Sequence, residues 1–184
     1  PNFSLQEYIA QPEVFQLERL IKISDPEKNK KTLFVWPEGI FYESNLTDIK
    51  KYQNLFEDKF SKNHLIILGI NNFQNLINIK KNKYFNSFVI LNYKAEVLFL
   101  YNKIKLVPFG EFLPFEKILS KFGLKKITPG YNSFSPGDKR EIFNLGKQFN
   151  EKLIFPLICY EIIYPGKIKK KNQFPDLIVN ISED

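Results

Sequence analysis

The feature that most constrains the fold is the segment at residues 65–70, which reads Leu-Ile-Ile-Leu-Gly-Ile without a polar residue. A strand with one face in solvent alternates apolar and polar residues, whereas a strand covered on both faces is apolar throughout. We therefore expect residues 65–70 to form a strand that is buried inside a layered structure.

Hydrophobic spacing along the rest of the chain predicts helices and further strands. Residues 13–23 place Leu17 and Ile21 at helical spacing. Residues 47–63 are the best candidate helix, with Thr47 as its cap. Strands are expected at 33–36, 85–91, 96–101, 141–145, 153–158 and 176–181, and a short helix at 116–122. Because helices and buried strands alternate in part, with hairpins between them, we expect an α/β or α+β layered domain.

The length of 184 residues suits one domain with a core and is short for two domains. Apolar residues are too plentiful for an intrinsically disordered chain. No run of 18 apolar residues occurs, so we expect no membrane-spanning helix within this chain. The chain contains no Met, even at position 1, so we expect it to be a piece of a longer protein.

Charge and cysteine content exclude several classes of function. The net charge is +7, but 25 lysines stand against 2 arginines, a pattern that A/T-rich codons produce without selection for charge. Because proteins that read phosphates and bases usually rely on Arg, we expect no nucleic-acid partner. Cys159 is the single cysteine, so an internal disulfide framework and a multi-cysteine zinc site are excluded.

Cys159 follows the apolar strand expected at 153–158 and precedes Tyr160-Glu161. One interpretation is a small buried apolar residue, and the other is a nucleophile that a dry strand delivers to a turn. A reactive thiol needs a base to become a thiolate. The sole histidine, His64, precedes a strand with no mark of a site around it, so we expect it to be structural or on the surface. A carboxylate is then the natural base.

Glu38 is a candidate for that base, because Trp36-Pro37-Glu38-Gly39 comes directly after a buried strand. Pro37 imposes extended geometry on Trp36, and Gly39 lets the chain turn away. A carboxylate at the end of a sheet, beside an aromatic wall, can have the raised pKa that suits a base. The alternative is an ordinary surface Glu in a turn.

The segment at 101–112 supplies a candidate cation. Lys103 follows a strand and precedes an apolar loop kinked by Pro108 and Gly110, where a compact ammonium could stabilise an oxyanion. Lys105 competes with it for this role on composition alone. Glu111 is a carboxylate on a loop otherwise made of Phe, Leu, Val and Pro, so it is either paired or functional.

These segments together resemble a known family. WPE at 36–38, YNKIKLVPFGEFLPF at 101–115 and ICYE at 158–161 resemble the three signature regions of the carbon–nitrogen hydrolase (nitrilase) superfamily. The narrower string LVPFGEFLPF is similar to the hydrolase-like domain of the apolipoprotein N-acyltransferases, as are the segments at 84–87 and 176–182. The resemblance implies a truncated nitrilase-like α-β-β-α sandwich, with one carbon–nitrogen hydrolase domain over residues 1–184 that is incomplete at both ends.

The resemblance also implies roles for individual residues. Glu38 matches the general base, Lys103 the oxyanion-stabilising lysine and Cys159 the nucleophile of a Glu–Lys–Cys triad. Two positions depart from the family pattern, because Lys105 stands where many relatives carry His and Glu183 replaces an expected Asn. The supporting residues that match the pattern are Glu111, Tyr160 and Glu161.

The activity implied by the resemblance is transfer of a fatty acyl chain from a phospholipid to the N-terminal amine of an apolipoprotein, through a thioester. It implies no cofactor and no metal. It also implies membrane helices, absent from this chain, that place the domain on the periplasmic side of a bacterial inner membrane.

The loop at 107–115 is more apolar than a solvated loop needs to be, so its side chains are candidates for lipid contact or for packing over another part of the domain. These side chains are Phe109, Phe112, Leu113 and Phe115.

Two alternative functions stay open. A soluble amidase or nitrilase would use the same triad on a small amide. A non-catalytic fragment or basic binding module would leave the three residues far apart in the structure.

Overall fold

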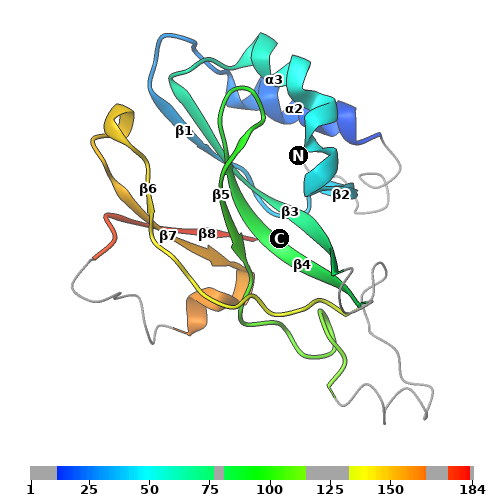
Figure 1. The fold of residues 1–184 in the computed structure, drawn as a ribbon. Coiled ribbons are helices and arrows are strands. Elements are labelled where there is room, and N and C mark those ends of the chain that lie inside the picture. Colours follow the sequence, from blue (N-terminus) through cyan, green and yellow to red (C-terminus); the bar gives the residue numbers. More distant parts are fainter. Residues whose placement is uncertain (1–11, 77–80, 115–132, 165–173, 183–184) are drawn as a thin grey trace.

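A computed structural model describes residues 12–76, 81–114, 133–164 and 174–182 (Figure 1). The α-helices are α2 (Glu13–Ser24) and α3 (Gln53–Lys59), and the 3-10 helices are η1 (Leu46–Tyr52), η4 (Lys147–Phe149) and η5 (Cys159–Ile163). The strands are β1 (Thr32–Val35), β2 (Phe41–Asn45), β3 (His64–Leu76), β4 (Lys81–Leu91), β5 (Val97–Asn102), β6 (Phe143–Asn144), β7 (Leu153–Ile158) and β8 (Leu177–Ile181).

The strands form two sheets. The larger sheet has the order β1-β3-β4-β5, and β2 also pairs with β3. In it, β1 runs parallel to β3, while β4 is antiparallel to both β3 and β5. The smaller sheet has the order β6-β7-β8, with β7 and β8 parallel. Consequently β1 and β5 point in the same direction, and their C-terminal ends lie at the same edge of the larger sheet.

The two sheets and the helices form layers, with α2 and α3 on one face of the larger sheet and the smaller sheet on the other (Figure 1). Strand β3 serves both interfaces. Ile66 and Leu68 pack into the core beneath the helices, whereas Leu65 and Ile67 pack into the core between the sheets. The expectation of a strand covered on both faces is confirmed, and the layers of helices and sheets form the α/β layered architecture expected from the sequence.

The core beneath the helices is rich in aromatic rings, and it fixes the end of β1. Trp36 is 3% exposed, and its ring lies 5.9 Å from the ring of Phe60. Its indole Nε1 donates a hydrogen bond to Ser24 Oγ at 3.0 Å, at the end of α2. Because Trp36 is held on both its apolar and its polar side, the residues that follow it leave the sheet from a fixed point.

Several element boundaries agree with the sequence analysis, and two do not. The helix expected at 13–23 and the strand expected at 153–158 are confirmed. The helix expected at 47–63 is instead η1 followed by α3, and Thr47 does not cap it. The backbone N–H of Asn45 donates to the Asp48 carboxylate at 2.9 Å, so the turn begins before Thr47. The strand expected at 141–145 is only two residues long, and the helix expected at 116–122 lies outside the described residues.

His64 is structural. It is 1% exposed, and its Nδ1 accepts a hydrogen bond from the Ser61 backbone N–H at 3.2 Å. Its Nε2 lies 3.0 Å from the Glu27 carbonyl oxygen, so a neutral ring with the proton on Nε2 satisfies both contacts. The ring also packs edge-on against Phe34 at 5.3 Å. The histidine therefore joins the start of β3 to the loop after α2.

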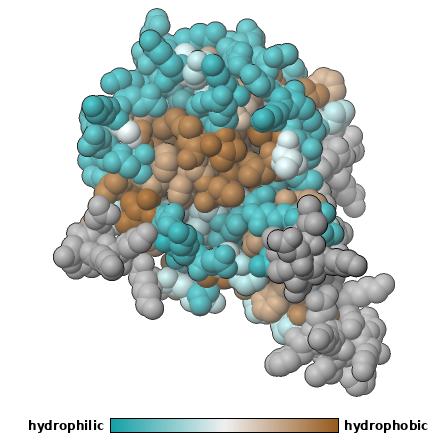
Figure 2. Space-filling view, in the orientation of Figure 1, coloured by the Kyte–Doolittle hydropathy of each residue, from teal (hydrophilic) through white to brown (hydrophobic). Residues whose placement is uncertain are grey.

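The surface carries an apolar band over β5, between hydrophilic areas above and below it (Figure 2). The exposed apolar side chains of this edge strand are Val97, Leu98 and Leu100. Within the described ranges, no helix has the length and apolar character that crossing a membrane requires.

Candidate active site

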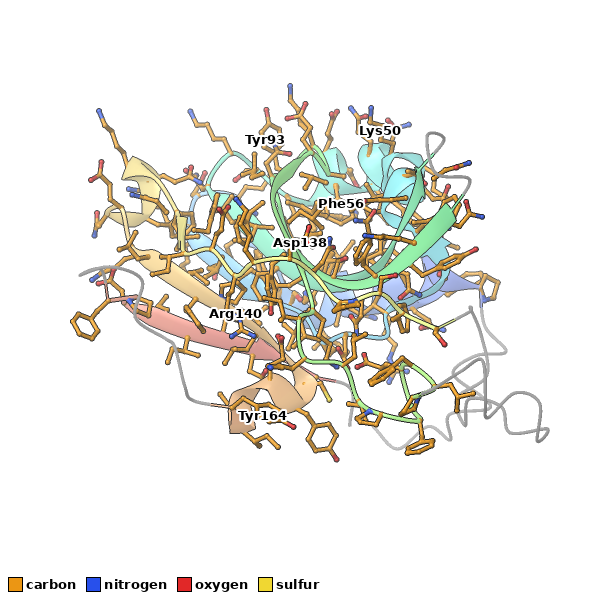
Figure 3. All side chains as sticks on the ribbon, turned by 60° about the horizontal axis from the view of Figure 1, so that its bottom comes forward. Lys50, Phe56, Tyr93, Asp138, Arg140 and Tyr164 are labelled. Carbon is orange, nitrogen blue, oxygen red and sulfur yellow. The ribbon has the colours of Figure 1, made fainter. Side chains whose placement is uncertain are left out.

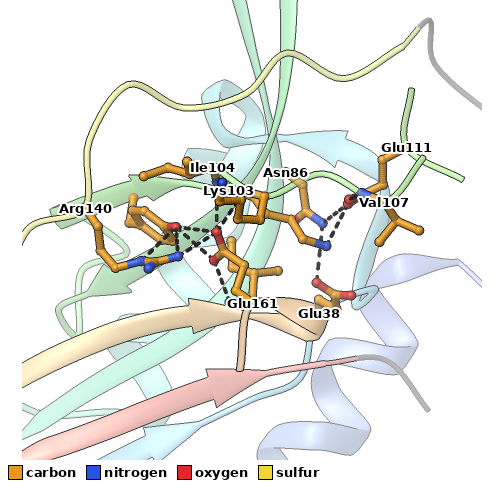
Figure 4. A network of polar contacts seen from close by, with 11 residues as sticks. Glu38, Asn86, Lys103, Ile104, Val107, Glu111, Arg140 and Glu161 are labelled. Atoms are coloured by element: carbon orange, nitrogen blue, oxygen red, sulfur yellow. Dashed lines mark hydrogen bonds and ion pairs between the residues drawn. The ribbon is translucent and has the colours of Figure 1, made fainter. Parts of the chain in front are cut away.

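Three segments that are far apart in the sequence meet where β1, β5 and β7 end. Glu38 lies just after β1, Lys103 directly after β5, and Cys159 directly after β7. Figure 4 shows Glu38, Lys103 and Glu111 converging around the amide of Asn86. The Cys159 thiol is within electrostatic range of Glu38, Lys103 and Glu111. The structure thus brings together the three residues that the sequence analysis singled out.

The ammonium of Lys103 is fixed in a buried position. Lys103 is 1% exposed, and its Nζ donates to Glu111 Oε1 at 2.9 Å. Its backbone N–H donates to the Asn86 carbonyl at 2.8 Å, and its own carbonyl accepts from the Gly137 N–H at 2.8 Å. Lys105, the competing candidate, is exposed. A buried, immobile cation is the kind of group that can stabilise a developing negative charge.

Glu111 is paired, which was one of the two expectations for it. Its Oε1 accepts from Lys103 and also from Asn86 Nδ2 at 3.0 Å. Its Oε2 accepts from the backbone N–H of Val107 at 2.9 Å. The carboxylate therefore holds Lys103 and the start of the 107–114 loop in one position.

Glu38 is placed by an unusually close approach of two chain segments. A Cβ at Gly69 on β3 would lie 2.6 Å from Glu38 Cβ and 2.7 Å from Glu38 Cα. Only glycine leaves room for Glu38 at this point, and Gly39 turns the chain away with φ 83°. Asn86 Nδ2 lies 3.4 Å from Glu38 Oε2, so the same amide contacts both carboxylates.

Cys159 begins η5 with φ 53°, in the left-handed region that residues other than glycine rarely adopt. Its side chain is half-buried. Burial raises the pKa of the Cys159 thiol, and the nearby Glu38 and Glu111 carboxylates raise it further, while Lys103 and a backbone hydrogen bond from Tyr160 lower it. The resting thiol is therefore protonated at neutral pH, and a reaction at this sulfur requires a base.

Glu161 turns inward from η5 and joins the lysine segment to the cysteine turn. Its Oε1 accepts from the backbone N–H groups of Ile104 and Lys105, both at 3.0 Å. Its Oε2 accepts from the backbone N–H of Ile158 at 3.1 Å. The Tyr101 hydroxyl donates to this carboxylate at 2.7 Å. The neighbouring Tyr160 instead lies on the surface, 56% exposed.

The structure describes the apolar loop at 107–115 only as far as residue 114. Phe109 is 46% exposed and has φ 64°, so its ring projects from a tight turn. Phe112 is half-buried. Leu113 is only 7% exposed, so it packs inside the protein. Phe115 lies outside the described residues.

The sequence analysis missed three residues that shape the site. Asn86 lies on β4, inside a segment that matched the family pattern, and its two carboxylate partners are on other segments. Gly69 lies within the apolar run at 65–70, and the sequence gave no sign that another backbone approaches it. Arg140 contacts Tyr101 and Glu161. The one feature of the sequence that could have pointed to Arg140 is the rarity of arginine, because the chain has 25 lysines and 2 arginines.

Curated apolipoprotein N-acyltransferases are similar to this chain. The enzyme from Rhizobium leguminosarum bv. trifolii is 28% identical over 173 residues, which cover 93% of this chain and 32% of that protein. The enzyme from Bradyrhizobium diazoefficiens is 36% identical over 100 residues, which cover 54% of this chain and 18% of that protein. The chain therefore spans about a third of the length of the relatives that match nearly all of it. The resemblance noted from the sequence is confirmed.

Solved structures share the fold at low sequence identity. A carbon–nitrogen hydrolase superfamily protein from Xanthomonas campestris has a TM-score of 0.57 and 12% identity, with 94% of this chain and 58% of that chain covered. An amidase of the nitrilase superfamily from Nesterenkonia AN1 has a TM-score of 0.55 and 12% identity, with 92% and 60% covered. The family model for carbon–nitrogen hydrolases matches residues 12–182, so this chain belongs to the carbon–nitrogen hydrolase family.

Proposed function

We propose that this chain is the catalytic domain of an N-acyltransferase. It moves a fatty acyl chain from a phospholipid to the α-amine of an N-terminal diacylglyceryl-cysteine on an apolipoprotein. The observation that carries this proposal is the buried Lys103–Glu111 pair within electrostatic range of Glu38 and Cys159, in a chain similar to apolipoprotein N-acyltransferases.

In the first half-reaction, Glu38 takes the proton from Cys159 Sγ, and the thiolate attacks the carbonyl carbon of the phospholipid ester. The negative charge that forms on the carbonyl oxygen is stabilised by the ammonium of Lys103. The ester oxygen then leaves as the hydroxyl of the lysophospholipid, carrying the proton held by Glu38. The acyl group remains on Cys159 as a thioester.

In the second half-reaction, the free amine of the diacylglyceryl-cysteine attacks the thioester carbonyl. Glu38 takes a proton from the amine, and Lys103 again stabilises the oxyanion. The carbon–sulfur bond breaks, the product leaves as an amide, and the proton returns from Glu38 to Cys159. An amine displaces a thioester readily, and a dry apolar site excludes competing water.

A lipid acyl donor is supported by exposed apolar side chains on two segments that contribute to the site. Ile162 and Ile163, on the η5 helix that Cys159 begins, are 50% and 60% exposed, and Phe109, on the loop that carries Glu111, is 46% exposed. Exposed apolar side chains next to a reactive site suit an acyl chain or a bilayer surface better than a small polar amide. From the similarity to apolipoprotein N-acyltransferases, we infer that the parent protein lies in a bacterial inner membrane with this domain on the periplasmic side.

The test is acyl-enzyme formation in the full-length protein that carries this chain. Incubation with phospholipid is expected to add one acyl mass to the peptide containing Cys159, and a diacylglyceryl-cysteine peptide is expected to remove it as an amide product. The matched control is Cys159→Ala, which is expected to form no adduct.

Two results would overturn the proposal. Either the wild-type protein forms no adduct with phospholipid, or Cys159→Ala still forms one. Hydrolysis of a small amide without any phospholipid adduct would establish the amidase alternative instead.

A further inference from the structure

Arginine is rare in this chain, and one of its two arginines lies inside the site. The sequence has 25 lysines and only Arg19 and Arg140, so arginine stands at 140 against the lysine bias of the chain. Arg140 precedes β6 and contacts Tyr101 of β5 and Phe155 of β7, on the side from which η5 and Tyr164 project (Figure 3). Its position suggests a requirement that lysine does not meet.

The contacts of Arg140 use the shape of the guanidinium group. Its Nε and a terminal nitrogen both lie within hydrogen-bond distance of the Tyr101 hydroxyl, at 3.0 and 2.8 Å. The same terminal nitrogen forms an ion pair with Glu161 at 2.7 Å. The guanidinium carbon lies 5.2 Å from the ring centroids of both Tyr101 and Phe155, so the group lies beside two aromatic rings. A lysine ammonium cannot make this planar, forked set of contacts.

Arg140 also decides the charge balance of the site. The side chain of Glu161 has no exposed surface, and a buried carboxylate is stable in its ionised form only when it is paired. The charged groups here are three carboxylates (Glu38, Glu111 and Glu161) and two cations (Lys103 and Arg140), so their formal sum is −1. Removal of Arg140 makes that sum −2, and the added negative charge lies two residues from Cys159.

We propose that Arg140 is a positioning residue. It pairs with the buried Glu161 carboxylate and compensates its charge, so that Glu161 can hold the lysine segment against the cysteine turn. This inference rests on the proposed function, because it assigns Arg140 a part in the reaction at Cys159.

The groups around Glu161 explain why its charge matters. The backbone N–H groups of Ile104, Lys105 and Ile158 all donate to it, and an ionised carboxylate is a stronger acceptor than a protonated one. Burial and the adjacent Glu161 carboxylate raise the pKa of Tyr101 well above its ordinary value, so its hydroxyl stays a donor. Loss of the guanidinium therefore leaves an uncompensated negative charge near the thiol and removes an ion pair that holds Glu161 in place.

The experiment measures the rate of alkylation of Cys159 by iodoacetamide against pH in the full-length protein, followed by mass spectrometry on the peptide that contains Cys159. Arg140→Met is expected to slow alkylation at pH 8 by about 3- to 10-fold, since added negative charge disfavours the thiolate. Arg140→Lys restores the charge and is expected to recover most of this rate. The matched control is Arg19→Met on α2, which is expected to leave the profile unchanged.

A double-mutant comparison tests whether Arg140 acts through Glu161. In a Glu161→Gln background the carboxylate charge is gone, so adding Arg140→Met is expected to change the alkylation rate by less than about twofold. A wild-type profile in Arg140→Met, or an undiminished effect of Arg140→Met in the Glu161→Gln background, overturns the inference. If Arg140→Met does not fold, Arg140→Lys and its acyl-transfer rate decide the question, because loss of the forked contacts is expected to lower kcat even with the charge retained.

The two proposals fail separately. If the wild-type protein forms no acyl adduct with phospholipid, the proposed function is wrong, and the alkylation profiles still decide the role of Arg140. If the adduct forms but the profiles of wild type and Arg140→Met coincide, only the inference about Arg140 is wrong.

Discussion

The thiol of Cys159 and the carboxylate of Glu38 influence each other through charge as well as through proton transfer. The Glu38 charge raises the pKa of the Cys159 thiol, whereas Lys103 lowers it. A negative neighbour therefore suppresses the thiolate at rest while it provides the base that creates the thiolate during the reaction. These two effects of Glu38 can be separated by experiment.

Glu38→Gln removes the negative charge and the base together. Because the charge no longer opposes ionisation, the pKa of Cys159 is expected to fall, and alkylation by iodoacetamide at pH 7 is expected to become about threefold faster or more. Acyl-enzyme formation from phospholipid is expected to fall by at least about 10²-fold, because no base remains. Parallel measurements of alkylation and acyl-adduct formation check this opposite response.

Lys103→Met is the comparison for Glu38→Gln. Loss of the cation is expected to raise the pKa of the thiol, so alkylation at pH 7 slows, and acyl-enzyme formation also falls. If Glu38→Gln and Lys103→Met shifted alkylation in the same direction, the electrostatic account of Cys159 would be wrong.

Gly69 sets the position of Glu38 through its missing side chain. In Gly69→Ala the new Cβ meets backbone and Cβ atoms of Glu38 at 2.6 to 2.7 Å, so the segment after β1 must move. We expect acyl-enzyme formation to fall by about 10²-fold, since a displacement of about 1 Å at a reacting group has that effect. The control is Gly110→Ala, whose Cβ would lie 3.5 Å from the nearest Val107 atom and is expected to have little effect. Equal activity of the two variants would contradict this account.

At the scale of elements, a buried carboxylate connects α2 to the β2–η1 segment. Glu13, the first residue of α2, is 3% exposed and accepts from the Ser44 backbone N–H at 2.8 Å and from the Tyr52 hydroxyl at 3.0 Å. Lys51 forms an ion pair with it at 3.5 Å. Burial, together with the hydrogen bond to Glu13, raises the pKa of Tyr52, so its hydroxyl stays protonated and donates.

Glu13→Ala is expected to lower the free energy of unfolding by about 1–3 kcal/mol, because it leaves buried donors on Ser44 and Tyr52 without their acceptor. Urea denaturation of the full-length protein measures this loss. Glu18→Gln, at an exposed position of the same helix, is the control and is expected to change stability by less than about 0.5 kcal/mol. Since α2 lies on the helix side of the large sheet, the alkylation profile of Cys159 is expected to stay unchanged in both variants.

The elements predicted best from the sequence are those whose signal is local. The sequence predicts β7 at 153–158, and it predicts that the run at 65–70, in the first half of β3, is covered on both faces, because burial on both faces leaves a continuous apolar pattern. The helix at 47–63 was wrong in detail because spacing of apolar residues does not separate a 3-10 helix from an α-helix.

The site residues divide in the same way. Glu38, Lys103 and Cys159 each follow a recognisable strand, so the sequence could mark them individually. Asn86 and Arg140 could not be marked, because the partners of their side chains in hydrogen bonds and ion pairs are 21 to 48 residues away and meet them only in the folded chain. The sequence therefore predicted which functional residues lie at the ends of strands, but it did not predict the contacts that join these residues to other segments.

At the scale of the whole molecule, β3 separates two hydrophobic cores and contributes side chains to both. Ile66 and Ile67 are adjacent, both fully buried, and face opposite cores. The core on the Ile67 side includes Ile158 and is packed against Cys159, whereas the core on the Ile66 side holds Trp36 and the helices. Ile66 and Ile67, although adjacent and of the same type, therefore belong to two different cores of the molecule.

Ile66→Ala and Ile67→Ala are each expected to lower the free energy of unfolding by about 2–5 kcal/mol, because each leaves a cavity in a close-packed core. Their effects on the site are expected to differ. The cavity of Ile67→Ala opens between the sheets, beneath the turn that holds Cys159 in its left-handed conformation, so acyl-enzyme formation and the alkylation profile should both change. Ile66→Ala, matched in residue type and burial, should leave acyl-enzyme formation and the alkylation profile near wild type at temperatures where the protein is folded.

Urea denaturation, alkylation and acyl-adduct formation in both variants test this difference between the two cores. If the two variants perturbed Cys159 equally, the two cores would be mechanically coupled through β3, and the site would depend on the helix layer as much as on the sheet that carries the cysteine.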